Sequence, residues 1–469
     1  MDINGVIGGE FKKALEYLTQ DPRELDKDID KNRAAYKGKH AILTDFNRRD
    51  KQVGDTPKTR RIVKHAKEVL TLQKRIVNSA VQFLFGTPLT LVLQNDTGKD
   101  AFAVITDIWK KNKLDYFNKS LARELFVERK AAELWHVPPT ATGTAKPRAR
   151  VTLLTKKNGY RIYPHFDEYG DMDAFTILYN TTDSAGKPVD NATIYTALKI
   201  IDAKKSEGNE WVVTPRNKTG ENILGLIPIV YYEQEETEWE GVGSEINRME
   251  DLISNFADTN DYFGSPVLQS KGIIENLPKK EETGKAVSVK PELGEDGKIY
   301  YPGGIEFITW DRAPEAIVIE YNILKDIVYG QTSTPDLSFS NVKGMTNLSG
   351  IAIRLMMTDA LNKAKDKQEV FGPATERRIS ILKTIAAKLN VSQATSINSL
   401  EIDIVFNESI PQDDKEIIDA LSIARGGNPT MSEQTAVRRN PMVTDPESDL
   451  EKMKSDRDQV KNLGESYLP

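Results

Sequence analysis

The chain has 469 residues, contains no cysteine and carries a formal net charge of −6 at pH 7. Its length exceeds what one hydrophobic core serves, so we expect two to four packed units. The missing cysteines exclude disulfides, thiolate zinc sites and a cysteine nucleophile. The mild negative charge argues against a protein that grips nucleic acid over its whole surface. We expect neither a signal peptide, because the first residues are amphipathic, nor a membrane span.

The charge is unevenly distributed along the chain. Residues 46–75 contain ten Lys or Arg and three Asp or Glu, whereas residues 401–469 contain fifteen acidic and eight basic residues. Such runs usually form solvated helix faces. The alternatives for the basic stretch are contact with phosphates or with a neighbouring subunit.

The first 135 residues are predicted to be mostly helical, with helices at about 10–19, 21–37, 58–85, 101–113 and 115–135. In the third helix, Ile62, Ala66, Val69, Ile76 and Leu84 recur at helical spacing. Gly86 and Pro88 end that helix, and a strand is predicted at 89–93. Asp115 suits the N-cap of the last helix, and its apolar stripe is predicted to comprise Leu121, Leu125, Ala132 and Trp135.

After a loop at 138–143 the pattern changes to strands. They are predicted at 150–155, 160–165, 173–180, 193–202 and 210–214, with turns at Asn158-Gly159, Gly170-Asp171 and Gly186-Lys187-Pro188. An antiparallel meander that closes with the segment 227–232 is expected.

A helix at 243–263 follows. Its apolar stripe is Ile246, Met249, Ile253, Phe256 and Ala257, and its polar face holds Asn247, Asp251, Ser254, Asp258 and Asp261. Residues 265–312 are rich in Gly, Pro, Lys and Glu, with short strands expected at 286–290 and 305–310. A second helix at 314–330, with the stripe Ile319, Ile323, Leu324 and Ile327, can run antiparallel to the first.

Residues 331–349 form a long polar loop, which inside a folded protein is typically functional or disordered. A helix at about 350–390 is predicted behind it, with Ser349 as N-cap. A strand at 402–406 and short helices at 411–425, 431–439 and 446–462 complete the chain. The fold class is therefore α+β.

No catalytic motif stands out. A Walker loop, a G-x-S-x-G elbow and an H-E-x-x-H helix are absent, and the four histidines lie far apart. Ser184 and Lys187 with Lys218-Thr219-Gly220 match two elements of serine acyl-transfer enzymes, but the third is missing. Asp167, Asp171 and Asp173 favour a hairpin turn over a calcium loop. We therefore expect no enzyme activity, no cofactor and no metal site.

The segment Ile76–Pro88 resembles the signature helix of the portal (head–tail connector) proteins of tailed bacteriophages, of the siphovirus type. Further similarity lies in residues 227–232 with the following helix, and in Ser349–Arg354. The order of elements agrees over roughly residues 30–425. The Pro-rich loop at 138–147 and the short C-terminal part after 425 depart from the family pattern.

The resemblance implies a portal architecture with a helical wing, an antiparallel strand meander, a two-helix stem, a small α/β clip, a long wing helix and a short helical crown. By position it implies wing at 1–242, stem helices at 243–264 and 313–331, clip at 265–312, tunnel loop at 332–349, wing spanning helix at 350–399 and crown at 400–469.

The resemblance further implies a homo-oligomeric ring of about twelve subunits at one capsid vertex of the virion, assembled in the host bacterial cytoplasm and without a membrane. Its expected partners are double-stranded DNA that slides without sequence specificity, the terminase large subunit, a head-completion or adaptor protein, and the major capsid and scaffolding proteins.

A sliding duplex should meet few phosphate-binding cations, because each one adds salt-sensitive affinity. We therefore expect an acidic stem face at the channel, comprising Asp251, Asp258, Asp261, Glu320 and Asp326. The expected DNA contacts of the tunnel loop are Asn341, Lys343, Met345 and Asn347, although Lys343 could be merely exposed. The alternative functions are a cytosolic hydrolase or transferase with an unrecognised site, or a non-portal phage structural protein.

Overall fold

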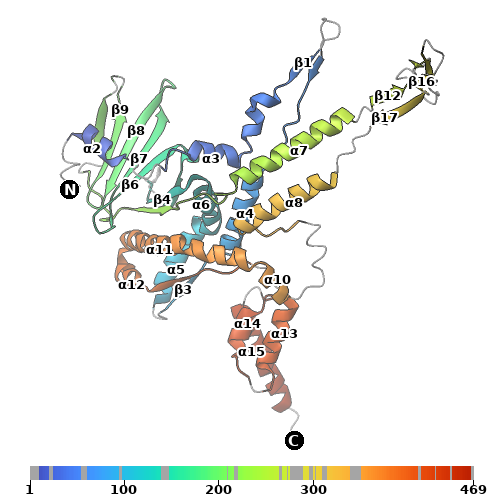
Figure 1. Cartoon of the computed structure of the whole chain (residues 1–469). Helices are drawn as coiled ribbons and strands as arrows, with labels where there is room; N and C mark the ends of the chain where they lie inside the picture. The colour runs from blue at the N-terminus through green and yellow to red at the C-terminus, as the bar shows by residue number, and fades with distance from the viewer. Residues whose placement is uncertain are drawn as a thin grey trace.

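The computed structural model describes residues 10–20, 25–53, 61–94, 98–138, 147–206, 208, 210–215, 220–263, 267–271, 273–274, 289–294, 299–301, 303–308, 314–338, 350–409, 414–427, 429–443 and 446–465. Helices and strands mix throughout, as the α+β class predicts. A central helical body carries a strand meander on one side, a projecting helix pair with a small insert, and a cluster of C-terminal helices (Figure 1).

The N-terminal helices α2 (Phe11–Leu18) and α3 (Ile29–Tyr36) are shorter than predicted. Two single-turn helices follow, η1 (Ala41–Thr44) and η2 (Phe46–Arg48), and then an antiparallel hairpin of β1 (Lys51–Val53) and β2 (Arg61–Val63). The predicted helix at 58–85 is therefore wrong in its first half. Helix α4 spans only Leu72–Phe85, because the preceding residues pair with β1 or bond to a distant helix.

The main core lies between four helices that are far apart in sequence. They are α4, α5 (Lys99–Lys111), α6 (Leu114–Glu128) and α11 (Thr358–Leu389), and their buried side chains form one apolar cluster. Strand β3 (Thr90–Leu93) follows the signature helix and pairs with β18 (Ile402–Val405), a strand from the last fifth of the chain.

The predicted helix at 115–135 is wrong in its last third. Helix α6 ends at Glu128, Arg129 adopts a left-handed backbone with φ of 68°, and the next residues form β4 (Lys130–His136). This strand is the centre of a three-stranded sheet with β5 (Arg150–Leu154) and β11 (Ile229–Glu233). Asp115, the expected N-cap, instead accepts a hydrogen bond from Trp109 Nε1 at 2.9 Å.

The expected meander is a five-stranded antiparallel sheet in sequence order. Its strands are β6 (Tyr160–Phe166), β7 (Met172–Thr182), β8 (Pro188–Thr196), β9 (Ile200–Lys205) and β10 (Trp211–Pro215), and η4 (Lys156–Asn158) precedes it. The single strand predicted at 193–202 is two strands, because Thr196 and Lys199 close a turn between them. The predicted turn at Gly170-Asp171 lies between β6 and β7, the turn at Asn158-Gly159 includes the last residue of η4, and the turn at Gly186-Lys187-Pro188 ends on the first residue of β8.

The helix predicted at 243–263 is α7 (Gly243–Phe263), and the second is α8 (Pro314–Gln331). They lie side by side and carry between them a small β insert (Figure 1). The described strands of the insert are β12 (Val267–Lys271), β13 (Ile273–Ile274), β14 (Val289–Lys290), β15 (Glu292–Leu293), β16 (Ile299–Tyr301) and β17 (Gly304–Ile308).

The helix predicted at 350–390 is two helices, because α10 (Gly350–Met356) and α11 are separated at Met357. Its proposed N-cap, Ser349, lies outside the described residues. After η5 (Val391–Gln393) and α12 (Ala394–Asn398) come β18 and three helices, α13 (Asp414–Arg425), α14 (Glu433–Arg439) and α15 (Pro446–Glu465). No helix in the described part of the chain is long and apolar enough to cross a membrane.

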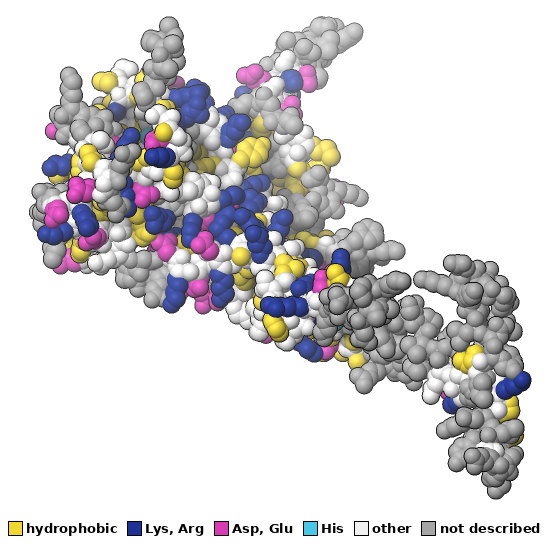
Figure 2. Space-filling view, turned by 90° about the horizontal axis from the view of Figure 1, so that it is seen from above, with side chains coloured by type: hydrophobic (Ala, Val, Ile, Leu, Met, Phe, Trp, Pro, Cys, Tyr) yellow, Lys and Arg dark blue, Asp and Glu magenta, His cyan; other side chains and the backbone are white. Residues whose placement is uncertain are grey.

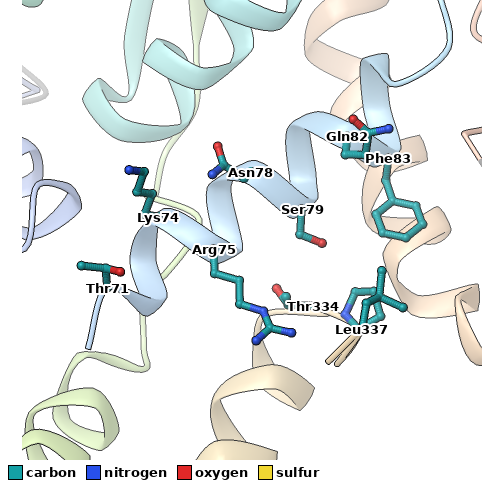
Figure 3. A pocket seen from close by; sticks show the side chains of 10 residues that line it. Thr71, Lys74, Arg75, Asn78, Ser79, Gln82, Phe83, Thr334 and Leu337 are labelled. Atoms are coloured by element: carbon teal, nitrogen blue, oxygen red, sulfur yellow. The ribbon is translucent and has the colours of Figure 1, made fainter. Parts of the chain in front are cut away.

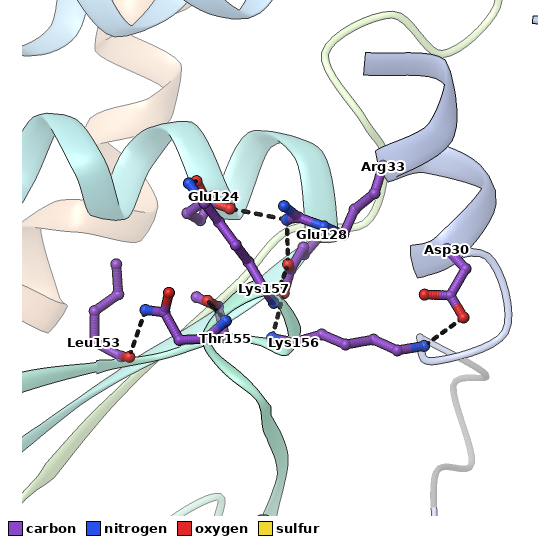
Figure 4. A network of polar contacts seen from close by, with 9 residues as sticks. Asp30, Arg33, Glu124, Glu128, Leu153, Thr155, Lys156 and Lys157 are labelled. Atoms are coloured by element: carbon purple, nitrogen blue, oxygen red, sulfur yellow. Dashed lines mark hydrogen bonds and ion pairs between the residues drawn. The ribbon is translucent and has the colours of Figure 1, made fainter. Parts of the chain in front are cut away.

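Two polar networks hold this body together. Arg378 of α11 is fully buried, donates to both carboxylate oxygens of Glu133 at 2.8 and 3.1 Å, and also bonds Asn118 and Tyr232. In the second network, Arg33 of α3 bonds Glu124 and Glu128 of α6 (Figure 4). Burial raises the pKa of Glu128, against the opposing effect of its hydrogen bonds and of Arg33. The networks fix α3, α6, β4, β11 and α11 relative to one another.

Candidate functional site

The helix pair α7–α8 holds all five residues of the expected acidic face. The two helices are joined by an ion pair in which Arg248 Nη2 lies 2.7 Å from Glu320 Oε1. Glu320 therefore carries a charge that Arg248 offsets. Asp326 is exposed on α8, and Asp261 is exposed near the end of α7.

One face of α7 is covered by an extended part of the chain, residues 64–71. Glu250, Ser254 and Asp258 accept hydrogen bonds from the backbone N–H groups of Leu70, Glu68 and Ala66, at 2.8, 2.9 and 2.7 Å. The acceptors are four residues apart on a helix, about 6 Å, and the donors are two residues apart, about 6.6 Å if extended. Because the two repeats nearly match, three successive acceptors can bond three alternate amides.

Arg48 strengthens this contact from the end of η2. Its guanidinium is buried and donates to Asp258 Oδ2 at 3.2 Å, to Asn255 Oδ1, and to the carbonyl oxygens of Asp251 and Ala66. Asp258 also faces His65 at 3.4 Å. The charge of Asp258 is therefore largely offset within the subunit, whereas the side chain of Asp251 stays 49% exposed at 3.7 Å from Arg48.

His40 lies at the base of the same contact and is buried. Its Nδ1 faces the Glu250 carboxylate and its Nε2 lies 2.9 Å from the carbonyl oxygen of Ala35. A carboxylate and a carbonyl oxygen both accept hydrogen bonds, so this arrangement favours the imidazolium form of His40, in which both ring nitrogens donate. The hydrogen bond to Glu250 raises the pKa of His40 in spite of its burial. We call residues 40–71, with the hairpin β1–β2, the arm.

The chain that leaves α8 is fastened to the signature helix. Asp336 accepts from Arg75 of α4 at 2.9 Å and from Lys325 of α8 at 3.1 Å. Partial burial is the largest single effect and favours the neutral carboxyl, but the hydrogen bonds from Lys325 and Ser338 and the charge of Lys325 together lower the pKa of Asp336. Asp336 lies in the first part of the expected tunnel loop, residues 332–349. The four loop residues expected to contact DNA, Asn341, Lys343, Met345 and Asn347, lie outside the described residues.

A cavity of about 450 Å³ lies beside this anchor, between α4 and residues 334–337 (Figure 3). It presents a polar helix face next to apolar side chains, with Lys74, Asn78, Ser79 and Gln82 from α4, and Phe83 and Leu337. The cavity is open to solvent, and residues 334–337, which follow α8, form one of its sides.

A third fastening lies where α7 begins and α8 ends. The buried carboxylate of Glu238 lies 2.7 Å from both Lys363 and Lys367, which are one turn apart on α11. Burial would raise its pKa, but the two ammonium groups lower the pKa of Glu238. Lys363 also donates to the carbonyl oxygen of Thr332 at 2.9 Å, just after α8. Sequence reasoning missed these partners, although a Lys pair four residues apart was visible.

The residues weighed for other functions are not assembled into a site in the described part of the chain. Ser184 lies exposed in the turn between β7 and β8. Lys218 and Thr219 are outside the described residues. Asp167 accepts from the N–H groups of Tyr169 and Asp171, which confirms the hairpin turn. Among the described residues no cluster of three His, Asp or Glu is arranged to hold a metal.

Basic side chains gather over the middle of the face seen from above in Figure 2. The arm contributes exposed cations at Arg49 and Lys64. Within the subunit, the basic side chains of the arm lie close to the acidic side chains of α7. Some carboxylates of α7 are therefore neutralised by the arm.

Comparisons with known proteins agree along nearly the whole chain. The family model described as "Phage portal protein, SPP1 Gp6-like" matches residues 16–463. A curated relative, the portal protein of Bacillus phage SPP1, is 21% identical over 461 residues, which covers 94% of this chain and 84% of the relative.

Solved structures were compared as well. A chain from the neck of an empty GTA particle matches with a TM-score of 0.39 and 9% identity, over 77% of this chain and 87% of that chain. A chain from the virion of a native gene transfer agent particle matches with a TM-score of 0.35 and 7% identity, over the same shares.

Proposed function

The chain belongs to the family of phage portal proteins described as SPP1 Gp6-like, and from that premise we propose that its copies close into a ring through which double-stranded DNA passes. As a portal protein it is a structural component of the phage particle, at the connection of head and tail. The family match over residues 16–463 is the observation that carries the proposal. The ring, its dozen subunits and its position at one capsid vertex belong to the proposal.

The parts of the ring subunit follow from the order of the elements. Helices α7 and α8 act as the stem, the β insert between them as the clip, and α13–α15 as the crown. Residues before α7, together with α11, act as the wing. The terminase large subunit and a head-completion or adaptor protein are the proposed partners at the two ends, and capsid and scaffolding proteins are those around the rim.

We assign the channel carboxylates to α7. Asp261 is exposed and keeps charge that can face a passing duplex, whereas Asp251 is half-exposed and lies 3.7 Å from Arg48. Asp258 is offset by Arg48, and Glu320 by Arg248. Asp326 stands among exposed apolar residues of α8, a poor lining for a water-filled channel. We therefore assign fewer acidic residues to the channel wall than the five predicted from sequence.

Negative-stain electron microscopy of the purified protein tests the proposal. We expect rings with a central hole wide enough for a DNA duplex. A protein that stays monomeric at micromolar concentration, and also when it is co-expressed with its capsid and scaffolding proteins, would overturn the proposal.

A further inference from the structure

Two surfaces in the described part of the subunit expose large apolar side chains to solvent. The first is on the arm and we call it the arm surface. It comprises Leu43, Phe46 and Ile62, which are 42%, 67% and 67% exposed, with the exposed cations Arg49 and Lys64. The Arg49 guanidinium lies over the Phe46 ring at 3.9 Å, so charge and apolar area are adjacent.

The hairpin at the end of the arm projects away from the rest of the subunit (Figure 1). In the described part of the chain, β1 and β2 pair only with each other. An isolated two-stranded hairpin is marginally stable in water, and its outer edges offer unpaired N–H and C=O groups. Packing against another protein surface would stabilise such a hairpin.

The base of the arm, in contrast, is rigidly held. Arg48, His40 and the three backbone hydrogen bonds to α7 fix its direction. The arm surface is therefore presented in one orientation before any partner arrives, and preorganisation of this kind lowers the entropic cost of docking.

The second surface is the outer side of α8, and we call it the α8 surface. Val318, Ile319, Ile323 and Ile327 are 58%, 59%, 54% and 36% exposed. The last three are spaced four residues apart, so they form one stripe. The exposed carboxylates of Glu315 and Asp326 lie on the same side of the helix. An unpartnered apolar stripe with carboxylates marks a contact site for a protein with apolar and basic groups.

The arm surface has that chemistry. Within one subunit, the arm is fastened to the Glu250–Asp258 face of α7, whereas α8 joins α7 through Arg248 on another face. Helix α7 thus separates the two surfaces (Figure 1). One subunit cannot bring its own surfaces together, but two copies arranged head to tail can, and such contacts generate rings.

We propose that the arm surface of each subunit docks on the α8 surface of the next copy in the ring, an inference that rests on the proposed function. Leu43, Phe46 and Ile62 cover the α8 stripe, while Arg49 and Lys64 approach Glu315 and Asp326. DNA is the weaker occupant for the arm, because phosphates would pair with its cations but leave its apolar side chains in water. Opposite charges set the register of the contact.

The absence of cysteine in the chain makes a clean cross-linking experiment possible. The test variant combines Ile62→Cys on the arm with Ile323→Cys on the α8 surface. The matched control combines Ile62→Cys with Val391→Cys, whose parent residue is 79% exposed outside both surfaces. Rings are first verified by electron microscopy, then treated with a short bis-maleimide and separated in denaturing gels.

We expect a ladder of cross-linked multimers in the test variant, with about tenfold more product than in the control, because docking raises the effective concentration of the two thiols. Rings in which the test pair gives no more product than the control overturn this inference and leave the proposed function intact. If the unmodified protein forms no rings, both fail. If Ile323→Cys prevents ring formation, Phe46→Cys with Val318→Cys repeats the test under the same criteria.

Discussion

At the scale of single residues, several charged side chains in the described part of the chain are buried together with a partner of opposite charge. Arg378 and Glu133 are the extreme case, because both side chains are almost completely buried. A buried pair adds little stability compared with apolar residues of similar volume, but removal of one partner leaves an uncompensated charge. The role of this pair is therefore to fix α11 against β4 and β11.

Replacing one partner of this pair should destabilise the subunit severely. For Glu133→Ala we expect a loss of about 3–5 kcal/mol in the free energy of unfolding, because the Arg378 guanidinium remains buried without its carboxylate. The double variant Glu133→Leu with Arg378→Met should be considerably more stable than the single variant. Urea denaturation of the unassembled subunit measures both. Arg161→Ala, an exposed arginine on β6, is the control, with a change within about 0.5 kcal/mol; a similar loss there would contradict the prediction.

His40 should make the stability of the subunit depend on pH. Its folded-state pKa is raised by Glu250, so the stabilisation is fully present below the unfolded pKa of about 6.5. It is lost as the pH rises through the raised folded-state value. The difference in unfolding free energy between the native chain and His40→Gln, measured by denaturation across this range, should therefore shrink with rising pH. A difference that stays constant with pH would show that the imidazolium is not responsible.

At the scale of elements, the arm and α7 depend on each other, because three backbone amides of the arm have their acceptors on α7. The segment has no helix or strand of its own between 64 and 71. Its order therefore comes from side chains that lie about two hundred residues away in the sequence.

Loss of the Asp258 carboxylate should loosen the arm. Asp258→Ala removes the acceptor of Ala66 N and one partner of Arg48, and a hydrogen bond to a charged group contributes about 1.5–3 kcal/mol. We expect hydrogen exchange at the amides of Ala66, Glu68 and Leu70 to be about tenfold faster or more. Asp261→Ala, on the same helix but exposed, should leave these amides unchanged. Equal effects of the two variants would exclude the specific bonds as the cause.

Dependence on partners that are distant in sequence also explains which elements could be predicted from the sequence and which could not. Helix α7 agrees with the predicted range because its apolar and polar faces follow one period over 21 residues. Residues 58–71 of the arm are predicted as part of a helix because Ile62, Ala66 and Val69 have helical spacing. Their partners on α7 are distant in sequence and leave no local signal. Strand β4 was missed for two reasons: its residues are buried on both faces, which removes the alternation, and Ala131, Ala132 and Glu133 favour helix.

The candidate site was predictable only in part, for the same reason. Helical spacing placed Asp251, Asp258 and Asp261 on the polar side of α7. The partners of Asp251 and Asp258, which are Arg48 and His65, could not be identified, because pairing across about two hundred residues depends on the finished fold. Asp258 is consequently an anchor for the arm, and Asp261 is the better candidate for the channel.

At the scale of the whole molecule, the proposed ring repeats each exposed charge once per subunit. A small change on α7 is therefore multiplied around the channel, while the same change on the meander sheet is spread over the rim. Electrostatic effects on DNA should thus depend on where a charge lies and not on the total charge of the protein.

A charge reversal in the channel should make rings hold DNA. With Asp261→Lys we expect tighter binding of duplex DNA to assembled rings, with a steeper fall of affinity as salt rises, because each lysine can neutralise a phosphate. Filter binding or fluorescence anisotropy at several salt concentrations measures both. Glu168→Lys makes the same change at an exposed turn of the meander. If both variants bind DNA alike, Asp261 does not face the duplex.

The fastening around Glu238 has a mechanical consequence. The residue stands just before α7, Thr332 stands just after α8, and Lys363 holds both while Lys367 holds the first. The start of α7 and the end of α8 are thus both held by the same turn of α11. If the helix pair α7–α8 tilts, either these contacts break or α11 moves together with the pair. Force applied at the outer tip of the projection would therefore reach α11 through this contact.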